Sequence, residues 1–177
     1  MRQTPSMTAD ATTALKCDLA SEVLRSFGSV RFAATGWSML PAVWPGDTLV
    51  VERVGPEQVH VGDVVLVGWE GGFCAHRVVS AVGEGETRRW ITQGDGMSAP
   101  DRPVPESELL GRVDYLIRAG RCMAVPAELG VVKTLLAKIV RRSTPAARAL
   151  VYLHRWVQTS HTRMVQTAEK PVPPCRG

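Results

Sequence analysis

Apolar residues near the start of the chain recur at helical spacing. Leu15, Leu19 and Val23 are four residues apart, and Gly28 follows shortly after the last of them. This spacing places the three side chains on one face of a helix, and glycine commonly follows the last residue of a helix. The pattern therefore predicts an N-terminal helix over residues 8–28.

From residue 30 onward the pattern changes to short apolar runs separated by turns that contain glycine and aspartate. Pro45-Gly46-Asp47 precedes one such run, and Gly62-Asp63 precedes the next. Runs of this kind between turn residues are typical of β-strands, and several in close succession favour a compact, largely antiparallel domain. We therefore expect a mainly β domain over residues 30–118. Its expected strands are Val30–Ala34, Thr48–Arg53, Val64–Trp69, His76–Val82, Arg89–Gln93 and Leu109–Ile117.

Residues 126–166 return to helical spacing. Leu129, Val132 and Leu136 fall on one side, basic residues dominate the rest, and a proline divides the stretch into two parts. This pattern predicts C-terminal amphipathic helices. The proline-rich segment at residues 167–177 has few apolar residues, so we expect it to be disordered.

Charge is unevenly distributed between the two parts of the chain. Residues 1–119 contain 11 Lys/Arg and 15 Asp/Glu, whereas residues 120–177 contain 10 Lys/Arg and 2 Asp/Glu. The net charges are therefore −4 and +8, which together make the +4 of the whole chain. Basic amphipathic helices contact anionic membrane surfaces or are simply solvated faces of packed helices. No nucleic-acid-binding motif accompanies the basic residues, so we expect no nucleic-acid partner.

The cysteines and the apolar content bear on the compartment. Cys17, Cys74, Cys122 and Cys175 form no Cys-x-x-Cys pair, which predicts free thiols in a reducing compartment and no structural zinc site. The chain offers no uninterrupted run of about twenty apolar residues and no signal peptide. We therefore expect a cytoplasmic or peripheral membrane location, without a transmembrane segment, and no cofactor.

One serine stands among bulky apolar residues. Ser38 lies between Trp37 and Met39 in a loop that contains two prolines. A serine hydroxyl becomes a nucleophile only when a base lies within hydrogen-bonding distance. His76, at the start of an expected strand, is a candidate base because histidine exchanges protons near neutral pH.

A carboxylate would hold the histidine ring in the required tautomer. The loop after the strand Arg89–Gln93 supplies two candidates, Asp95 and Asp101. By contrast, Asp47 and Asp63 lie in turns, and we interpret them as turn residues. We also expect Arg77, next to the histidine, to be a structural partner of a carboxylate.

Five short motifs occur in a fixed order across residues 30–118. They are Gly36-Trp37-Ser38-Met39-Leu40-Pro41 with Gly46-Asp47, then Gly62-Asp63-Val64-Val65, Ala75-His76-Arg77-Val78-Val79, Thr92-Gln93-Gly94-Asp95 with Asp101, and Leu110-Gly111-Arg112-Val113. In this order they resemble the sequence boxes of the type I signal peptidases. Histidine stands where the bacterial housekeeping members have lysine, and no lysine occurs between Ser38 and Asp101. The similarity is therefore to the archaeal, endoplasmic-reticulum and spore-former type, which uses serine, histidine and aspartate.

The resemblance implies a partly coiled, barrel-like β-domain and a serine endopeptidase activity. It implies Ser38 as the nucleophile, His76 as the general base, Asp101 as the catalytic aspartate and Asp95 as a second carboxylate of the same box. It also implies cleavage after small residues in an extended leader or precursor peptide, which binds as an added β-strand. Apolar residues near the serine, such as Leu40, face lipid in family members.

Two alternatives remain open at this stage. The first is a self-cleaving relative of the SOS-repressor autoproteases, although the lysine base of those proteins is absent here. The second is an inactive relative that still binds extended peptides along a sheet edge. Family members also carry a transmembrane helix before the serine, whereas the pattern here predicts a soluble helix, so the substrate and the compartment stay open.

Overall fold

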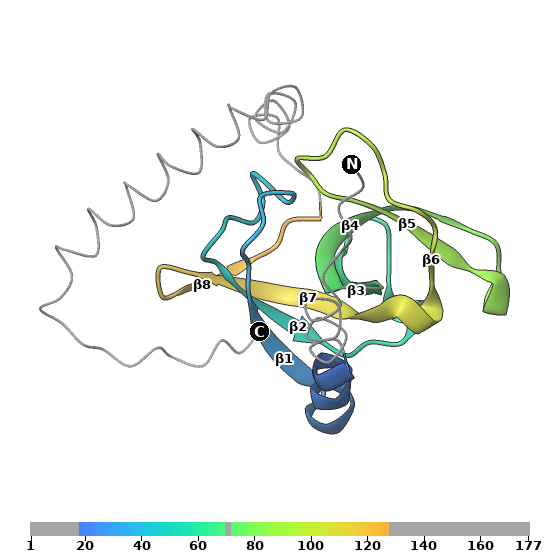
Figure 1. The fold of residues 1–177 in the computed structure, drawn as a ribbon, viewed down its shortest axis with the longest axis horizontal. Coiled ribbons are helices and arrows are strands. Elements are labelled where there is room, and N and C mark those ends of the chain that lie inside the picture. Colours follow the sequence, from blue (N-terminus) through green and yellow to red (C-terminus); the bar gives the residue numbers. More distant parts are fainter. Residues whose placement is uncertain (1–17, 70–71, 128–177) are drawn as a thin grey trace, which may run out of the picture.

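Eight strands form one antiparallel sheet in the computed structural model, which describes residues 18–69 and 72–127 (Figure 1). The strand order is β1-β2-β7-β3-β4-β5-β6, and β8 pairs with β7. The mainly β class expected from the sequence is therefore confirmed. The strands are β1 (Ser29–Ala33), β2 (Thr48–Glu52), β3 (Val64–Trp69), β4 (Gly72–Val82), β5 (Arg89–Gln93), β6 (Val104–Pro105), β7 (Leu109–Arg118) and β8 (Arg121–Ala124).

Residues 18–27 form a helix that leads into β1 (dark blue in Figure 1). Leu24 on this helix is buried in the same apolar cluster as Leu49 of β2. The N–H of Gly28 donates a hydrogen bond to the Leu24 carbonyl, and a φ of 74° at Gly28 turns the chain out of the helix. The earlier part of the expected N-terminal helix lies outside the described residues, as do the C-terminal helices from residue 128 onward and the segment 167–177.

The central strand β3 is buried on both faces of the sheet. Val64 and Leu66 belong to one apolar cluster, and Val65 and Val67 belong to another. A strand that is covered on both faces has a continuous apolar sequence, and this explains the run from residue 64 to residue 67. The strand β3, which pairs with the strand that carries His76, is therefore fixed in the core.

The strand β4 pairs with different neighbours along its length. Its first part, up to Arg77, pairs with β3, and its second part, from Arg77 onward, pairs with β5. His76 lies opposite Val65 of β3, next to the position where the pairing changes. The change of partner turns the two ends of β4 toward different parts of the sheet, and it leaves His76 at the junction.

The apolar residues after Ser38 belong largely to the core. Leu40 has no exposed surface, and Met39, Ala42 and Val43 are also buried. The expectation that the apolar residues around the serine face lipid is wrong for Leu40, because its side chain is completely buried. Trp37, by contrast, keeps 39% of its surface exposed.

The cysteines correct a second expectation. Cys122 on β8 is disulfide-bonded, whereas Cys74 on β4 is a free thiol. The expectation of four free thiols is therefore wrong for Cys122, and the cysteines no longer indicate a reducing compartment. Disulfide pairing depends on distance in space, which the spacing of cysteines along the sequence does not reveal.

Among the described residues, no helix has the length and apolar character needed to cross a membrane.

Candidate active site

Three side chains that are far apart in the sequence form one hydrogen-bonded chain. Ser38 lies in the loop between β1 and β2, His76 lies on β4, and Asp101 lies in the loop between β5 and β6. The Nε2 atom of His76 is 3.1 Å from the Oγ of Ser38, and its Nδ1 atom is 2.6 Å from the Oδ2 of Asp101. The structure thus brings together three of the four candidate site residues.

The contact with Asp101 fixes the position of the proton on the His76 ring. An ionised carboxylate only accepts hydrogen bonds, so the Nδ1 atom that contacts it carries a proton. Nε2 is then the nitrogen with a free lone pair, and it accepts a hydrogen bond from the Ser38 hydroxyl. This is the arrangement that a histidine base requires to take the proton of a serine nucleophile.

Thr92 on β5 holds the Asp101 carboxylate in place. Its hydroxyl donates to the same Oδ2 at 2.7 Å, and the Asp101 backbone N–H donates to the Thr92 carbonyl at 2.8 Å. The Thr92 side chain is completely buried. Sequence reasoning gave Thr92 no role, and its place at the start of the Thr92-Gln93-Gly94-Asp95 motif is the signal that could have found it.

Two glycines bring the loop after β5 against the serine. The N–H of Gly96 donates to the Ser38 carbonyl at 2.7 Å. A Cβ atom at Gly94 would lie 2.6 Å from the same carbonyl oxygen and 3.1 Å from the Nε2 of His76. A side chain at position 94 would therefore push apart the serine and the histidine, which explains why a glycine is needed there.

Asp95 has a different partner from Asp101. Its carboxylate accepts two hydrogen bonds from Arg77, at 2.8 and 2.9 Å, and both side chains are buried. The expectation that Arg77 is a structural partner of a carboxylate is confirmed. Arg77 also donates to the carbonyls of Gly62 and Pro126, each at 2.7 Å. Asp95 therefore lies beside the chain of Ser38, His76 and Asp101, and its ion pair supports a structural role in the loop.

A second ion pair fixes the loop that carries Ser38. Asp47, which is 1% exposed, accepts hydrogen bonds from the backbone N–H of Trp44 and from two side-chain nitrogen atoms of Arg118. Arg118 also donates to the Ala42 carbonyl at 3.1 Å. The turn role expected for Asp47 is confirmed by its bond to Trp44. The serine is therefore held on a rigid loop.

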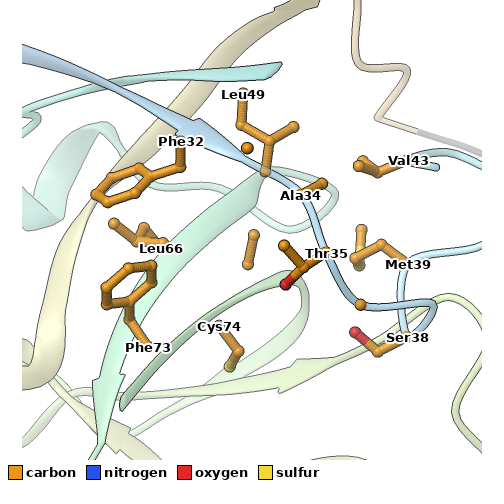
Figure 2. A pocket seen from close by; sticks show the side chains of 13 residues that line it. Phe32, Ala34, Thr35, Ser38, Met39, Val43, Leu49, Leu66, Phe73 and Cys74 are labelled. Carbon is orange, nitrogen blue, oxygen red and sulfur yellow. The ribbon is translucent and has the colours of Figure 1, made fainter. Parts of the chain in front are cut away.

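A pocket of about 220 Å³ opens beside Ser38 (Figure 2). Apolar side chains line most of it, among them Phe32, Met39, Leu49, Leu66 and Phe73. None of the described residues that line it has a charged side chain. The pocket therefore offers an uncharged, mostly apolar surface within reach of the serine hydroxyl.

The free thiol of Cys74 forms part of the pocket wall. Burial raises the pKa of Cys74 to about 11, although the Trp69 Nε1–H donates a hydrogen bond to its Sγ at 2.8 Å. The thiol is therefore protonated and neutral at pH 7, and it is a weak nucleophile there.

Two strand edges face this pocket. Ala33 of β1 and the residues Phe73, Cys74 and Ala75 of β4 line it. Within the described residues, β1 pairs only with β2, and the part of β4 before Arg77 pairs only with β3. Each of these strands thus has one edge without a partner strand in the described part of the chain.

The backbone N–H of Ser38 is an available hydrogen-bond donor. No residue in the described ranges accepts a hydrogen bond from it. In serine peptidases, a backbone N–H at the serine stabilises the oxygen of the carbonyl group that is attacked.

The described residues contain no group of three or more His, Cys, Asp or Glu side chains placed to hold a metal ion.

No protein-family model matches the chain, and no curated protein matches it significantly either. The features of the described residues that bear on function are the hydrogen bonds of Ser38, His76 and Asp101 and the pocket beside them.

Proposed function

We propose that this protein is a serine endopeptidase that resembles the type I signal peptidases of the serine–histidine–aspartate type. The observation that supports the proposal is the continuous hydrogen-bonded chain from the Ser38 Oγ through His76 to Asp101. The three residues come from three separate segments, so local sequence alone does not account for their convergence. Serine peptidases on unrelated folds use the same sequence of contacts.

The geometry supports a two-step acyl transfer. His76 Nε2 takes the Ser38 proton while the Oγ attacks the carbonyl carbon of a peptide bond, and Asp101 stabilises the charged ring. The Ser38 N–H donates to the oxygen that becomes negative. His76 then gives its proton to the leaving amine. In the second step His76 takes a proton from water as the water oxygen attacks the ester carbon at Ser38, and His76 then gives this proton to the Ser38 Oγ as the C–O bond breaks, which releases the acid product and the free serine.

The substrate of this reaction is an extended segment of a leader or precursor peptide. The open edges of β1 and β4 support binding of the peptide as an added strand, because each edge can form backbone hydrogen bonds with it. The coiled, barrel-like form of the sheet belongs to the same proposal. It is supported by the change of partner along β4 and by the burial of β3 on both faces.

Exposed apolar side chains near the serine support a location at a membrane surface. Trp37 is 39% exposed next to Ser38, and Met97 is 37% exposed on the loop that contacts the serine. Amphipathic aromatic side chains favour the interface between water and lipid. In a vesicle flotation experiment we expect the protein to float with the vesicles. Recovery of all the protein in the soluble fraction would contradict a membrane location and favour a purely cytoplasmic one.

The decisive experiment is peptide cleavage by purified protein with and without the proposed nucleophile and base. We expect Ser38→Ala and His76→Ala each to lower kcat/KM by about 10⁴-fold or more, because the triad works as a unit. Labelling with a fluorophosphonate probe should occur at Ser38 and disappear in both variants.

Three other outcomes would contradict the proposal. Full cleavage by either variant would show that another group carries the chemistry. Cleavage of the chain itself, seen as a loss of mass on incubation, would favour a self-cleaving protein. Retained peptide binding without labelling or cleavage would favour an inactive peptide-binding protein.

A further inference from the structure

The pocket beside Ser38 is larger than a small side chain requires. Its volume is about 220 Å³, whereas an apolar protein cavity of about 150 Å³ accommodates benzene. Three of the residues at its wall, Ala33, Ala34 and Ala75, have only a methyl group as side chain. An alanine side chain of a substrate would leave most of this volume unfilled.

The chemistry of the wall excludes a charged occupant. Among the described residues that line the pocket none is charged, and the polar side chains there are those of Thr35, Ser38 and Cys74. An ionised group in such a pocket would lose its hydration without gaining an ion pair. The occupant is therefore an uncharged, apolar group.

The shape of the pocket connects this space to the reaction. Ser38 lies at one end, and Phe32 and Phe73 lie at the other, with their ring centroids 4.7 Å apart (Figure 2). When the Ser38 Oγ reaches a substrate carbonyl carbon, the side chain of the residue that bears this carbonyl is next to the pocket entrance. The aromatic pair lines the far end, and the volume of about 220 Å³ suits a side chain of four or more carbon atoms.

We propose that this pocket binds a leucine, methionine or phenylalanine side chain on the N-terminal side of the cleaved bond. The inference rests on the proposed function, and it differs from the preference for small residues that the family resemblance implies. One methylene group in an apolar pocket changes kcat/KM by about 10- to 200-fold. We therefore expect kcat/KM to be at least about tenfold higher for leucine than for alanine at this position.

The test uses a peptide library prepared from a denatured proteome, with cleavage sites identified by mass spectrometry. We expect leucine, methionine and phenylalanine to be enriched directly before the cleaved bonds. Enrichment of alanine and glycine there would overturn the proposal. Enrichment of large apolar residues only two positions further upstream would also overturn it, because a different side chain would then fill the pocket.

Two variants with the same chemical change sharpen the result. Ala34→Leu places a larger side chain in the pocket wall and should shift the preference toward alanine and glycine. Ala81→Leu makes the same change at an exposed position on the second part of β4, away from the pocket, and should leave the preference unchanged. An unchanged preference in Ala34→Leu, with fluorophosphonate labelling of Ser38 retained, would contradict the assignment.

A binding measurement separates this proposal from the proposed activity. Calorimetric titration of the Ser38→Ala variant with acetylated peptides that end in leucine or alanine needs no cleavage. Binding at least about tenfold tighter for leucine supports the pocket assignment even if the wild-type protein cleaves nothing. Equal binding of the two peptides would overturn it even if the wild-type protein cleaves peptides.

Discussion

Asp101 has two side-chain partners, and they differ in their expected roles in the proposed reaction. His76, which also contacts Ser38, donates to its Oδ2, whereas the completely buried Thr92 donates to the same atom through its hydroxyl. Removal of the carboxylate charge therefore affects the imidazolium directly. Removal of the threonine hydroxyl affects only the position of the carboxylate.

We expect Asp101→Asn to lower kcat by about 10⁴-fold, because the amide favours the wrong histidine tautomer. Thr92→Val should lower kcat by a smaller factor and leave KM nearly unchanged, because the carboxylate remains and loses one of its hydrogen bonds. Steady-state kinetics on a cleaved peptide measure both effects. Thr48→Val on β2, the same change outside the site, is the control and should match the wild type. A loss in Thr92→Val as large as that in Asp101→Asn would contradict the positioning role.

Gly94 shows how a missing side chain can determine the site. A Cβ there would lie 2.6 Å from the Ser38 carbonyl oxygen, so either the loop or the serine must move. We expect Gly94→Ala to lower kcat/KM by at least about 10²-fold, because small displacements of reacting groups have effects of this size. Its cost in the free energy of unfolding should be only about 1–3 kcal/mol.

Gly68→Ala on β3 is a matched control for Gly94→Ala. A Cβ at Gly68 meets its nearest atom, on Leu110, at 3.5 Å, which is ordinary van der Waals contact. Comparison of urea unfolding and peptide cleavage for the two variants separates a local effect on the site from a general loss of stability. Wild-type activity in Gly94→Ala would show that the loop accepts a side chain against the serine.

At the scale of elements, the ion pair between Arg77 and Asp95 connects β4 to the loop after β5. Both side chains are less than a tenth exposed, and both hydrogen bonds are short. Loss of one member of such a pair leaves a buried charge without its partner. The pair therefore stabilises the packing of the loop after β5 against β4, and these two elements carry Asp101 and His76.

We expect Asp95→Ala to lower the free energy of unfolding by about 3–5 kcal/mol, because Arg77 then keeps a buried, uncompensated charge. Glu22→Ala, which breaks the exposed pair of Glu22 with Arg25, is the control and should change it by less than about 1 kcal/mol. Urea denaturation measures both. A small effect of Asp95→Ala, close to that of the control, would mean that solvent compensates Arg77.

The elements also show which parts of the fold sequence patterns predict. The strands β3 and β5 match their expected bounds, because apolar and β-branched runs stand between clear turn residues. The strand β4 begins at Gly72, four residues before the expected start, because a glycine next to a turn gives no strand signal. The sequence pattern does not predict the short strands β6 and β8, because their strand conformation depends on pairing with β5 and β7.

At the scale of the whole molecule, the residue types of the site could be predicted, but their supporting contacts could not. Ser38, His76 and Asp101 stand in motifs that resemble a known family. The bond from Gly96 to Ser38 depends on how two distant segments approach one another in space, and the bond from Thr92 to Asp101 depends on how the loop after β5 folds back on that strand. The role of Asp95 could not be separated from that of Asp101 in the sequence, because both are carboxylates in one loop, and only their partners differ.

The contacts of Arg77 decide where this protein can be shortened. Its guanidinium group donates to the carbonyls of Pro126 and Ala127, at 2.7 and 3.1 Å, as well as to Asp95. A protein that stops at Val125 loses both acceptors and so disturbs the loop that rests on Ser38. Any comparison meant to isolate the basic C-terminal residues should therefore keep the chain through Ala127.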